Sequence, residues 1–172
     1  PREHTRLLVP MIQSVLQDSK QELSGLDAIV LGNGPGSFIG MRIAASVAQG
    51  LAHGAGLGIV PVSSLAAVAG EVFSQRAEQF VAIAQDAHMS EVYFGLYRRG
   101  QDDLPAEVCP ERIHDQNPIA ELKALPAEQL VAAGDGWNRY PALFDSNADS
   151  LLARTKVLFP RARYLLPLGE AA

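Results

Sequence analysis

A glycine-rich segment between an apolar run and a helix-forming run constrains the fold of this chain more than any other feature. Four glycines fall within residues 32–40. Glycine accepts positive φ and close backbone contacts that a Cβ forbids, and Pro35 fixes one further φ. The segment is therefore a turn of defined shape between a buried strand at 27–31 and a helix at 41–53. Its candidate functional residues are Gly34, Pro35, Gly36, Ser37, Phe38 and Gly40.

Two roles are open to such a strand-to-helix turn. The backbone N–H groups at a helix start can bind phosphate, or the glycines can simply permit a sharp reversal and close packing. A P-loop requires Gly-Lys-Ser/Thr, but Met41 and Arg42 follow Gly40. The dinucleotide fingerprint Gly-x-Gly-x-x-Gly fails because Ile39 occupies its last position. These residues favour a packing turn over a nucleotide site.

Hydrophobic periodicity predicts alternating helices and strands in the first half of the chain. A helix is expected at 5–19, where Pro10 should kink it or delay its start. After the glycine-rich turn, a strand is expected at 57–62. A further helix is expected from Ser63 or Ser64 to residue 77. This β-α-β-α order implies parallel strands with right-handed crossovers.

The second half has a different pattern, in which shorter strands alternate in the manner of hairpins. Near residue 78 the pattern changes, and we place a domain boundary there, which gives domains 1–78 and 79–172. Strands are expected at 80–85, 91–97, 107–114 and 129–133, and helices at 117–124, 137–144 and 161–170.

The composition excludes several classes of function. The net charge of −5, from 14 basic and 19 acidic residues, argues against a broad grip on a phosphate backbone, so a role with nucleic acid would run through partners. Cys109 is the single cysteine, which excludes an internal disulfide. No apolar run reaches the ~18 residues that a membrane span needs. The sequence therefore predicts a cytoplasmic protein without contact with a membrane.

Three stretches of the chain resemble the bacterial TsaB (YeaZ) family of tRNA threonylcarbamoyladenosine biosynthesis proteins. The most specific is Gly-Pro-Gly-Ser-Phe-Ile-Gly-Met-Arg-Ile at 34–43, continued by Ala-Gln-Gly-Leu-Ala at 48–52. Residues 1–12 are similar to the first helix of that family. The run Asp-Ala-His-Met-Ser-Glu-Val-Tyr at 86–93 is similar to its hairpin.

The resemblance implies the two-lobed α/β fold shared by actin, Hsp70 and the sugar kinases (ASKHA). The family usually has threonine where Ile39 stands and arginine where His88 stands, and both differences weaken the case for an anion site. Family members begin with strands that carry an Asp-Thr pair, whereas this chain enters a helix directly from Pro1. The resemblance therefore predicts an N-terminally truncated first lobe, with strand 28–31 at an open sheet edge that invites pairing.

The two helices that flank the first strand carry the clearest indication of binding. The apolar stripe on helix 5–19 exceeds what one small lobe requires. Helix 41–53 is rich in alanine, and Gly50 costs ~1 kcal/mol relative to alanine there, which favours close approach of another element. Both helices could instead cover only their own sheet. The residues alone favour that intramolecular packing.

The resemblance shifts this balance toward a partner. In the TsaB family the helix pair contacts the homologous subunit TsaD, or a second copy of itself when TsaD is absent. Arg42 is a candidate to pair with a carboxylate of the partner, although it could also lie along its own helix. The implied partner-binding residues are His4, Leu7, Leu8, Met11, Val15, Met41, Arg42, Ala45, Ala48, Gln49 and Ala52.

Catalytic and metal-binding groups are sparse. The histidines at positions 4, 53, 88 and 114 include no i, i+4 pair, so we expect no helical zinc site and no cofactor. Ser37 has no identifiable histidine base. Asp86, His88 and Glu91 could form a polar cluster, but such residues are typical of a solvated turn. Asp135 could face a nucleotide cleft, but a local turn is favoured.

Two functions remain open. In the first, implied by the resemblance, the chain is a non-catalytic scaffold that binds TsaD and supports threonylcarbamoyl transfer to adenosine 37 of tRNA. It would also help to recruit the ATPase TsaE, and it would meet tRNA only through the complex. In the second, it is a nucleotide-binding ATPase or kinase-like enzyme of the same superfamily that uses the glycine-rich turn and Asp135. The missing P-loop lysine and the presence of Ile39 count against the second.

Overall fold

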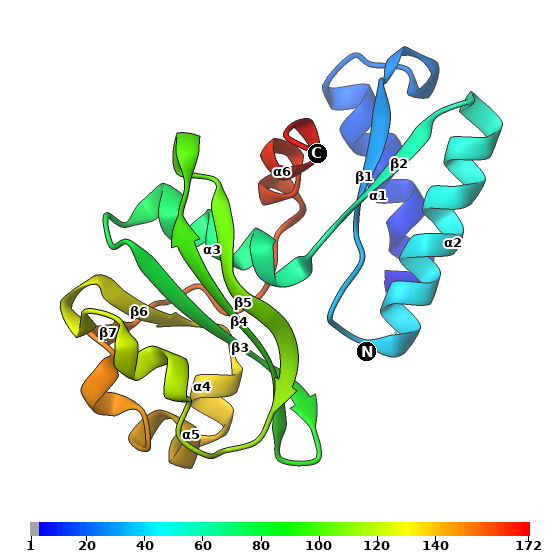
Figure 1. The fold of residues 1–172 in the computed structure, drawn as a ribbon. Coiled ribbons are helices and arrows are strands. Elements are labelled where there is room, and N and C mark those ends of the chain that lie inside the picture. Colours follow the sequence, from blue (N-terminus) through cyan, green and yellow to red (C-terminus); the bar gives the residue numbers. More distant parts are fainter. Residues whose placement is uncertain (1–3) are drawn as a thin grey trace.

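The protein contains two β-sheets that lie in separate lobes (Figure 1). The computed structural model describes residues 4–172, with side chains from Arg6 onward. The smaller sheet is a parallel pair formed by β1 (Ala28–Gly32) and β2 (Gly58–Val62). The larger sheet has five strands in the order β5-β4-β3-β6-β7. Among residues 4–172, β2 is the single strand that pairs with β1.

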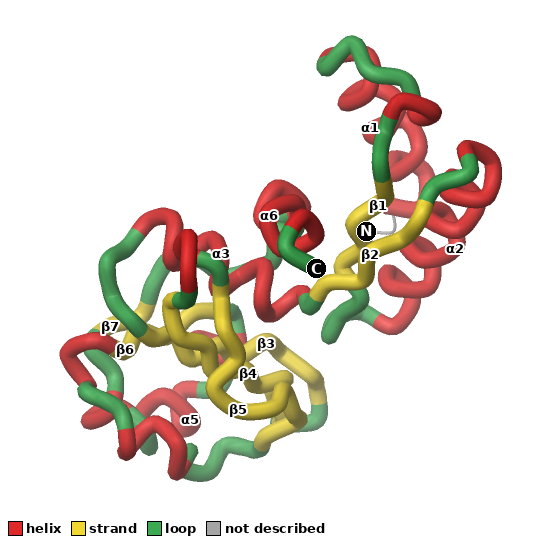
Figure 2. The backbone as a smooth tube through the Cα atoms, turned by 45° about the horizontal axis from the view of Figure 1, so that its top comes forward, coloured by secondary structure: helices red, strands yellow, loops and turns green. Residues whose placement is uncertain are grey.

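Helices cover both faces of the smaller sheet. α2 (Phe38–Ala55) packs on β1 and β2, α1 (His4–Asp18) lies beside α2, and α6 (Leu166–Glu170) approaches from the other side (Figure 2). A Cβ built on Gly169 would lie 2.4 Å from Cγ2 of Val30, so this face of β1 meets α6. Because side chains alternate along a strand, the neighbours of Val30 point toward the opposite, α2 side.

The starts and interiors of α1 and α2 differ from the expectations. Pro10 lies inside α1 and neither ends it nor delays its start. Its missing N–H removes one helical hydrogen bond, to the carbonyl of Arg6, and Arg6 is exposed to water that can satisfy that carbonyl. α2 begins at Phe38 instead of residue 41, because Ser37 caps it by accepting a hydrogen bond from Gly40 N at 3.4 Å.

The larger sheet combines an antiparallel meander with a parallel extension. All four strands predicted in the second half of the chain are present, with shifted or extended ends. The two-residue strand at the edge of the larger sheet, β7, was not predicted, because a strand that short has no periodic pattern. The strands are β3 (Phe80–His88), β4 (Glu91–Arg99), β5 (Pro105–His114), β6 (Leu130–Ala133) and β7 (Ala153–Arg154).

Different helices cover the two faces of the larger sheet. α3 (Ser64–Gln75) packs Leu65 and Val72 on one face, in a core that includes Ile83. α4 (Gly136–Arg139) and α5 (Pro141–Asp145) cover the other face, where Trp137 Nε1 donates to the Ala82 carbonyl at 3.1 Å. The boundary at residue 78 stays a prediction. However, α3 lies before that boundary and still packs on the larger sheet.

Several predicted helices are shorter or divided in the structure. The expected helix at 137–144 divides at Tyr140, because Pro141 begins a new helix, a position that suits proline. The expected helix at 161–170 is likewise a 3₁₀ turn followed by α6. The expected helix at 117–124 is reduced to a 3₁₀ turn. The 3₁₀ turns are Leu23–Gly25, Gln101–Asp103, Ala120–Ala124, Ala127–Gln129, Ala148–Ser150 and Ala162–Tyr164.

Candidate functional site

The glycine-rich turn is tied to both lobes by backbone hydrogen bonds. The N–H of Asn33 donates to the Val62 carbonyl at 2.9 Å, and the Gly34 carbonyl accepts from Ser64 N at 2.7 Å. Gly34 has a φ of +97°, and a Cβ built there would lie 2.6 Å from Cε of Met41. The backbone conformation therefore favours glycine at position 34, and the methionine side chain packs closely against it. The packing role that the sequence favoured accounts for this glycine.

The start of α2 presents apolar side chains to solvent. Phe38 is 67% exposed and Ile39 is 61% exposed. The guanidinium of Arg42, one turn further, lies 3.8 Å from the centre of the Phe38 ring, a distance typical of a cation–π contact. Arg42 therefore lies along its own helix in the isolated chain, and its charge remains at the surface beside two apolar groups.

Helix α1 presents a second apolar stripe. Leu7, Met11 and Val15 recur every four residues and therefore share one face of the helix. They are 46%, 61% and 64% exposed, whereas Leu8 is half-buried. The side chain of His4 lies outside the described part of the chain. We call seven of the exposed residues on these two helices the helix-pair surface: Leu7, Met11, Val15, Phe38, Ile39, Arg42 and Gln49.

The middle of α2 corrects part of the implied partner-binding set. Ala48 and Ala52 are only 5% and 6% exposed within the chain itself, so their side chains are not part of an exposed surface. Met41 and Ala45 are half-buried. Gly50, in contrast, is exposed, and a Cβ built there would meet no atom within 4 Å. Packing inside the described chain therefore does not explain this glycine.

A polar cluster joins the start of α3 to the larger sheet. The carboxylate of Glu111 on β5 accepts hydrogen bonds from the hydroxyls of Ser63 and Tyr97. Burial and the hydrogen bond to Glu111 raise the pKa of Tyr97 well above its ordinary value, so this phenol stays protonated. The sequence reasoning did not find this cluster, because its members are distant in sequence and belong to no motif.

A second polar cluster holds the end of β3. Asp86 accepts a hydrogen bond from the Tyr140 hydroxyl at 2.7 Å and forms an ion pair with Arg139, whose Nε lies 2.9 Å from its other carboxylate oxygen. Burial acts to raise the pKa of Asp86, but the hydrogen bonds from Tyr140 and the His88 N–H, with the charge of Arg139, bring it below its ordinary value. Asp135 accepts from the N–H of Asp86 at 3.1 Å. The expectation of a solvated turn agrees with the exposed His88 and Glu91 but is wrong for Asp86. The expectation of a merely local turn at Asp135 is also wrong.

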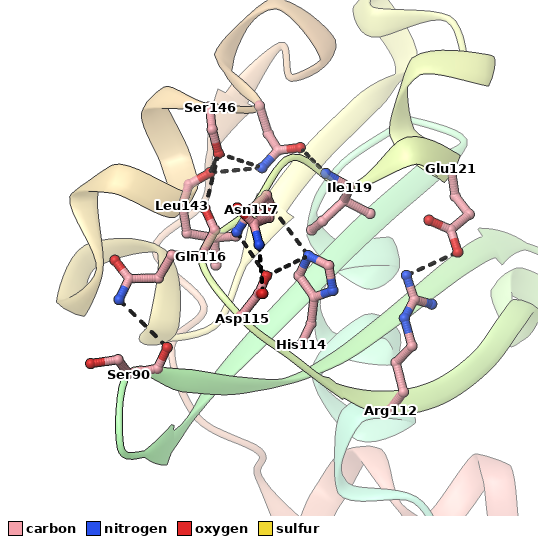
Figure 3. Close-up of polar contacts among 11 residues, drawn as sticks. Ser90, Arg112, His114, Asp115, Gln116, Asn117, Ile119, Glu121, Leu143 and Ser146 are labelled. Atoms are coloured by element: carbon pink, nitrogen blue, oxygen red, sulfur yellow. Dashed lines mark hydrogen bonds and ion pairs between the residues drawn. The ribbon is translucent and has the colours of Figure 1, made fainter.

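The turn after β3 is supported from the loop that follows β5 (Figure 3). Its residues His88, Met89 and Ser90 all have positive φ, between 51° and 66°, a region that non-glycine residues rarely adopt. Gln116 Nε2 donates to the Ser90 carbonyl at 3.5 Å. The same loop is held by Asn147, which is 4% exposed and accepts a hydrogen bond from the N–H of Ile119 at 2.7 Å. These contacts give the hairpin a structural role.

The described residues offer little that would support chemistry. Within residues 6–172, no group of three or more histidine, cysteine, aspartate or glutamate side chains is placed to hold a metal ion. The Ser37 hydroxyl acts as a helix cap. None of the helices between residues 4 and 172 is long and apolar enough to cross a bilayer. The feature that stands out is the helix-pair surface.

Comparison with known proteins places this geometry in a family. The family model for TsaD, tRNA N6-adenosine threonylcarbamoyltransferase, matches residues 1–172. The tRNA threonylcarbamoyladenosine biosynthesis protein TsaB of Escherichia coli (strain K12) is 36% identical over 175 residues, covering 98% of this chain and 73% of that protein. TsaB of Haemophilus influenzae is 33% identical over 181 residues, covering 98% of this chain and 72% of that protein.

Solved structures agree with the sequence relatives. A crystal structure described as an uncharacterized protein with similarity to peptidase YEAZ from Pseudomonas aeruginosa superposes with a TM-score of 0.88 at 34% identity, covering 100% of this chain and 77% of that one. The structure of YeaZ from Pseudomonas aeruginosa superposes with a TM-score of 0.85 at 33% identity, covering 98% of this chain and 77% of that one. The fold is thus that of the two-lobed, actin-like α/β proteins. Within this class, the chain belongs to the TsaB (YeaZ) family.

Proposed function

We propose that this chain is a non-catalytic subunit in the biosynthesis of tRNA threonylcarbamoyladenosine. It binds a TsaD homologue, the threonylcarbamoyltransferase, through the helix-pair surface and supports transfer to adenosine 37 of tRNA. It also helps to recruit the ATPase TsaE, and without TsaD it pairs with a second copy of itself. The observation that carries the proposal is the exposure of Leu7, Met11 and Val15 in one stripe of α1.

The energetics of the stripe support a partner. Full burial of a leucine, valine or methionine side chain is worth about 1.5–3 kcal/mol, and this chain leaves three of them substantially in water on one helix face. Exposed apolar side chains that are contiguous, unlike scattered single ones, mark interaction sites. Phe38 and Ile39 add two more on the neighbouring helix. The charged Arg42 gives the surface one polar contact at its edge.

The role of tRNA in this proposal is indirect. The net charge of −5 does not favour a broad grip on the phosphate backbone, so the chain meets tRNA through the complex. Because tRNA modification takes place where tRNA is used, the proposed complex acts in the cytoplasm.

The alternative is a nucleotide-binding ATPase or kinase-like enzyme. The sequence argues against it, because Met41 and Arg42 follow Gly40 where a P-loop has lysine and a hydroxyl residue. The pocket beside Pro35 is lined by Glu111 and by Arg112, whose guanidinium is already paired with Glu121. A calorimetric titration with Mg-ATP separates the two functions. We expect no measurable heat of binding, whereas tight binding by the isolated chain would favour the enzyme.

The proposal is tested by titrating a purified TsaD homologue with three proteins. Met11→Glu places a charge in the stripe, and we expect it to weaken binding at least about tenfold. Leu152→Glu is the matched control, because Leu152 is a similarly exposed apolar residue of the other lobe and should leave binding unchanged. If the folded Met11→Glu protein binds as tightly as the unaltered chain, the proposed surface is wrong.

A further inference from the structure

One face of the larger sheet extends beyond the helix that covers it. α3 begins at Ser64, and its first apolar side chain, Leu65, packs against β4 at Gly95, where an added Cβ would lie 3.1 Å from Cδ1 of Leu65. Tyr93 lies two residues from Gly95 and therefore on the same face, beside its partner Ile113 on β5. Tyr93 is half-buried and Ile113 is 56% exposed. The face therefore continues past the start of α3 without a helix above it.

The glycine-rich turn closes this uncovered end into a pocket. The pocket has a volume of about 230 Å³ and is lined by Pro35, Leu65, Tyr93, Glu111, Arg112 and Ile113. We call it the β5 notch. It lies between the two lobes, because Pro35 belongs to the turn that follows β1 and the other lining residues belong to α3 and the larger sheet.

The charged residues of the β5 notch are already paired inside the chain. Glu111 accepts from Ser63 and Tyr97. The Arg112 guanidinium lies 2.9 Å from a carboxylate oxygen of Glu121 (Figure 3). The surface left to an occupant is therefore mainly apolar, from proline, leucine, tyrosine and isoleucine. An apolar side chain suits such a pocket, whereas a phosphate would find a carboxylate there.

The β5 notch is joined to the helix-pair surface by a short segment of the chain. Pro35 is three residues before Phe38 in the chain, and Phe38 and Ile39 are among the most exposed apolar residues of α2. A subunit that covers the start of α2 therefore reaches the edge of the notch. We propose that the same homologous subunit that binds the helix-pair surface inserts one apolar side chain into the β5 notch. This inference rests on the proposed function and extends the interface from the first lobe onto β5 of the second.

The consequence concerns the geometry of the complex. A partner held by α1 and α2 alone would constrain only the smaller lobe. A partner that also occupies the β5 notch contacts both lobes and fixes their relative position when it binds. Fully buried apolar anchors of this kind contribute a large share of the energy of protein interfaces.

The test compares three variants in a calorimetric titration with the purified TsaD homologue. Ile113→Glu places a carboxylate at the β5 notch and should weaken binding at least about tenfold. Ile113→Trp should also weaken binding, because the larger ring fills the notch and excludes the partner's side chain. Val108→Glu is the control. Val108 lies on the same strand, is 41% exposed and does not line the notch. The affinity of this variant should match that of the unaltered chain.

Each result decides between defined outcomes. If Ile113→Trp, with an unchanged melting temperature, binds as tightly as the unaltered chain or more tightly, then the β5 notch receives no side chain and the inference is overturned. Met11→Glu serves as the reference for the helix-pair surface. Loss of binding in Met11→Glu with full binding in both Ile113 variants refutes the inference alone. An unaltered chain that does not bind the homologue refutes the proposed function together with the inference.

Discussion

The hydroxyl of Ser63 donates a hydrogen bond to the carboxylate of Glu111, which lies 48 residues further along the chain. Ser63 also caps α3 by accepting from Leu65 N at 3.0 Å and from Ala66 N at 3.2 Å. The same carboxylate oxygen accepts from the hydroxyl of Tyr97, a side chain only 3% exposed. One carboxylate thus holds the start of α3 against the edge of the larger sheet, next to the glycine-rich turn.

We predict that Glu111→Ala lowers the free energy of unfolding by about 1–3 kcal/mol, because the Tyr97 hydroxyl would lose its acceptor while buried. Urea unfolding followed by circular dichroism measures this change. Glu128→Ala, at an exposed carboxylate in the same lobe, is the control and should stay within about 0.5 kcal/mol of the unaltered protein. Equal midpoints for the two variants would contradict the structural role of Glu111.

The lowered pKa of Asp86 predicts a pH dependence of stability. A carboxyl whose pKa is lower in the folded protein than in the unfolded chain stabilises the fold above its unfolded pKa, and this stabilisation is lost as the pH falls through its folded pKa. Asp86→Asn should therefore be less stable at pH 7, and the difference should shrink on acidification below about pH 4. Thermal melts from pH 7 to pH 2 test this. Asp149→Asn, at an exposed site, should run parallel to the unaltered protein at every pH.

Arg99 ties the end of α3 to β4. Its guanidinium donates to the carbonyls of Phe73, at 3.0 Å, and Arg76, and lies 4.9 Å from the centre of the Phe73 ring. Lysine cannot reproduce this planar set of donors, so Arg99→Lys should cost about 1–3 kcal/mol of stability. The neighbouring Arg98→Lys, on the exposed side of the strand, should be near neutral. A chemical denaturation series in which both variants lose the same stability would refute this role for Arg99.

A substitution at Gly50 should change the affinity for a partner without lowering the stability of the fold. A Cβ there meets no atom within 4 Å, and glycine costs a helix ~1 kcal/mol relative to alanine, so Gly50→Leu should fold with unchanged or higher stability. Its side chain would project from the exposed side of α2 and obstruct a closely packed partner. We expect at least about a tenfold loss of affinity for the TsaD homologue, measured by titration. A Gly50→Leu protein with full affinity would show that no partner approaches α2 closely at this position.

The sequence carried the local features of this fold better than the contacts between distant segments. The glycine-rich turn and the strands beside it were predictable, because a residue such as Gly34 indicates a backbone conformation with positive φ. The sequence does not predict the tertiary position of α3, because an apolar helix face does not specify which of two sheets it will cover. The partners of Asp86 were missed for a similar reason, since Asp135 and Tyr140 lie 49 and 54 residues away.

The residues of the helix-pair surface were likewise predicted only in part. Periodicity identified a stripe that includes Leu7, Leu8, Met11 and Val15, and all of these except the half-buried Leu8 are exposed in the structure. Alanine, however, is equally suited to packing on a sheet and to a close contact with another helix. The resemblance therefore implied a partner contact for Ala48 and Ala52, although both are buried within the chain itself.

Hydrogen exchange of this chain, alone and with a purified TsaD homologue, shows whether the helix-pair surface binds the partner. We expect the amides slowed by the partner to be concentrated in α1 and α2, the helices His4–Asp18 and Phe38–Ala55. The amides of α4 and α5, on the far face of the larger sheet, should exchange at unchanged rates. If slowing in a saturated complex is confined to the larger sheet and its helices, with α1 and α2 unaffected, the helix-pair surface is not the binding site.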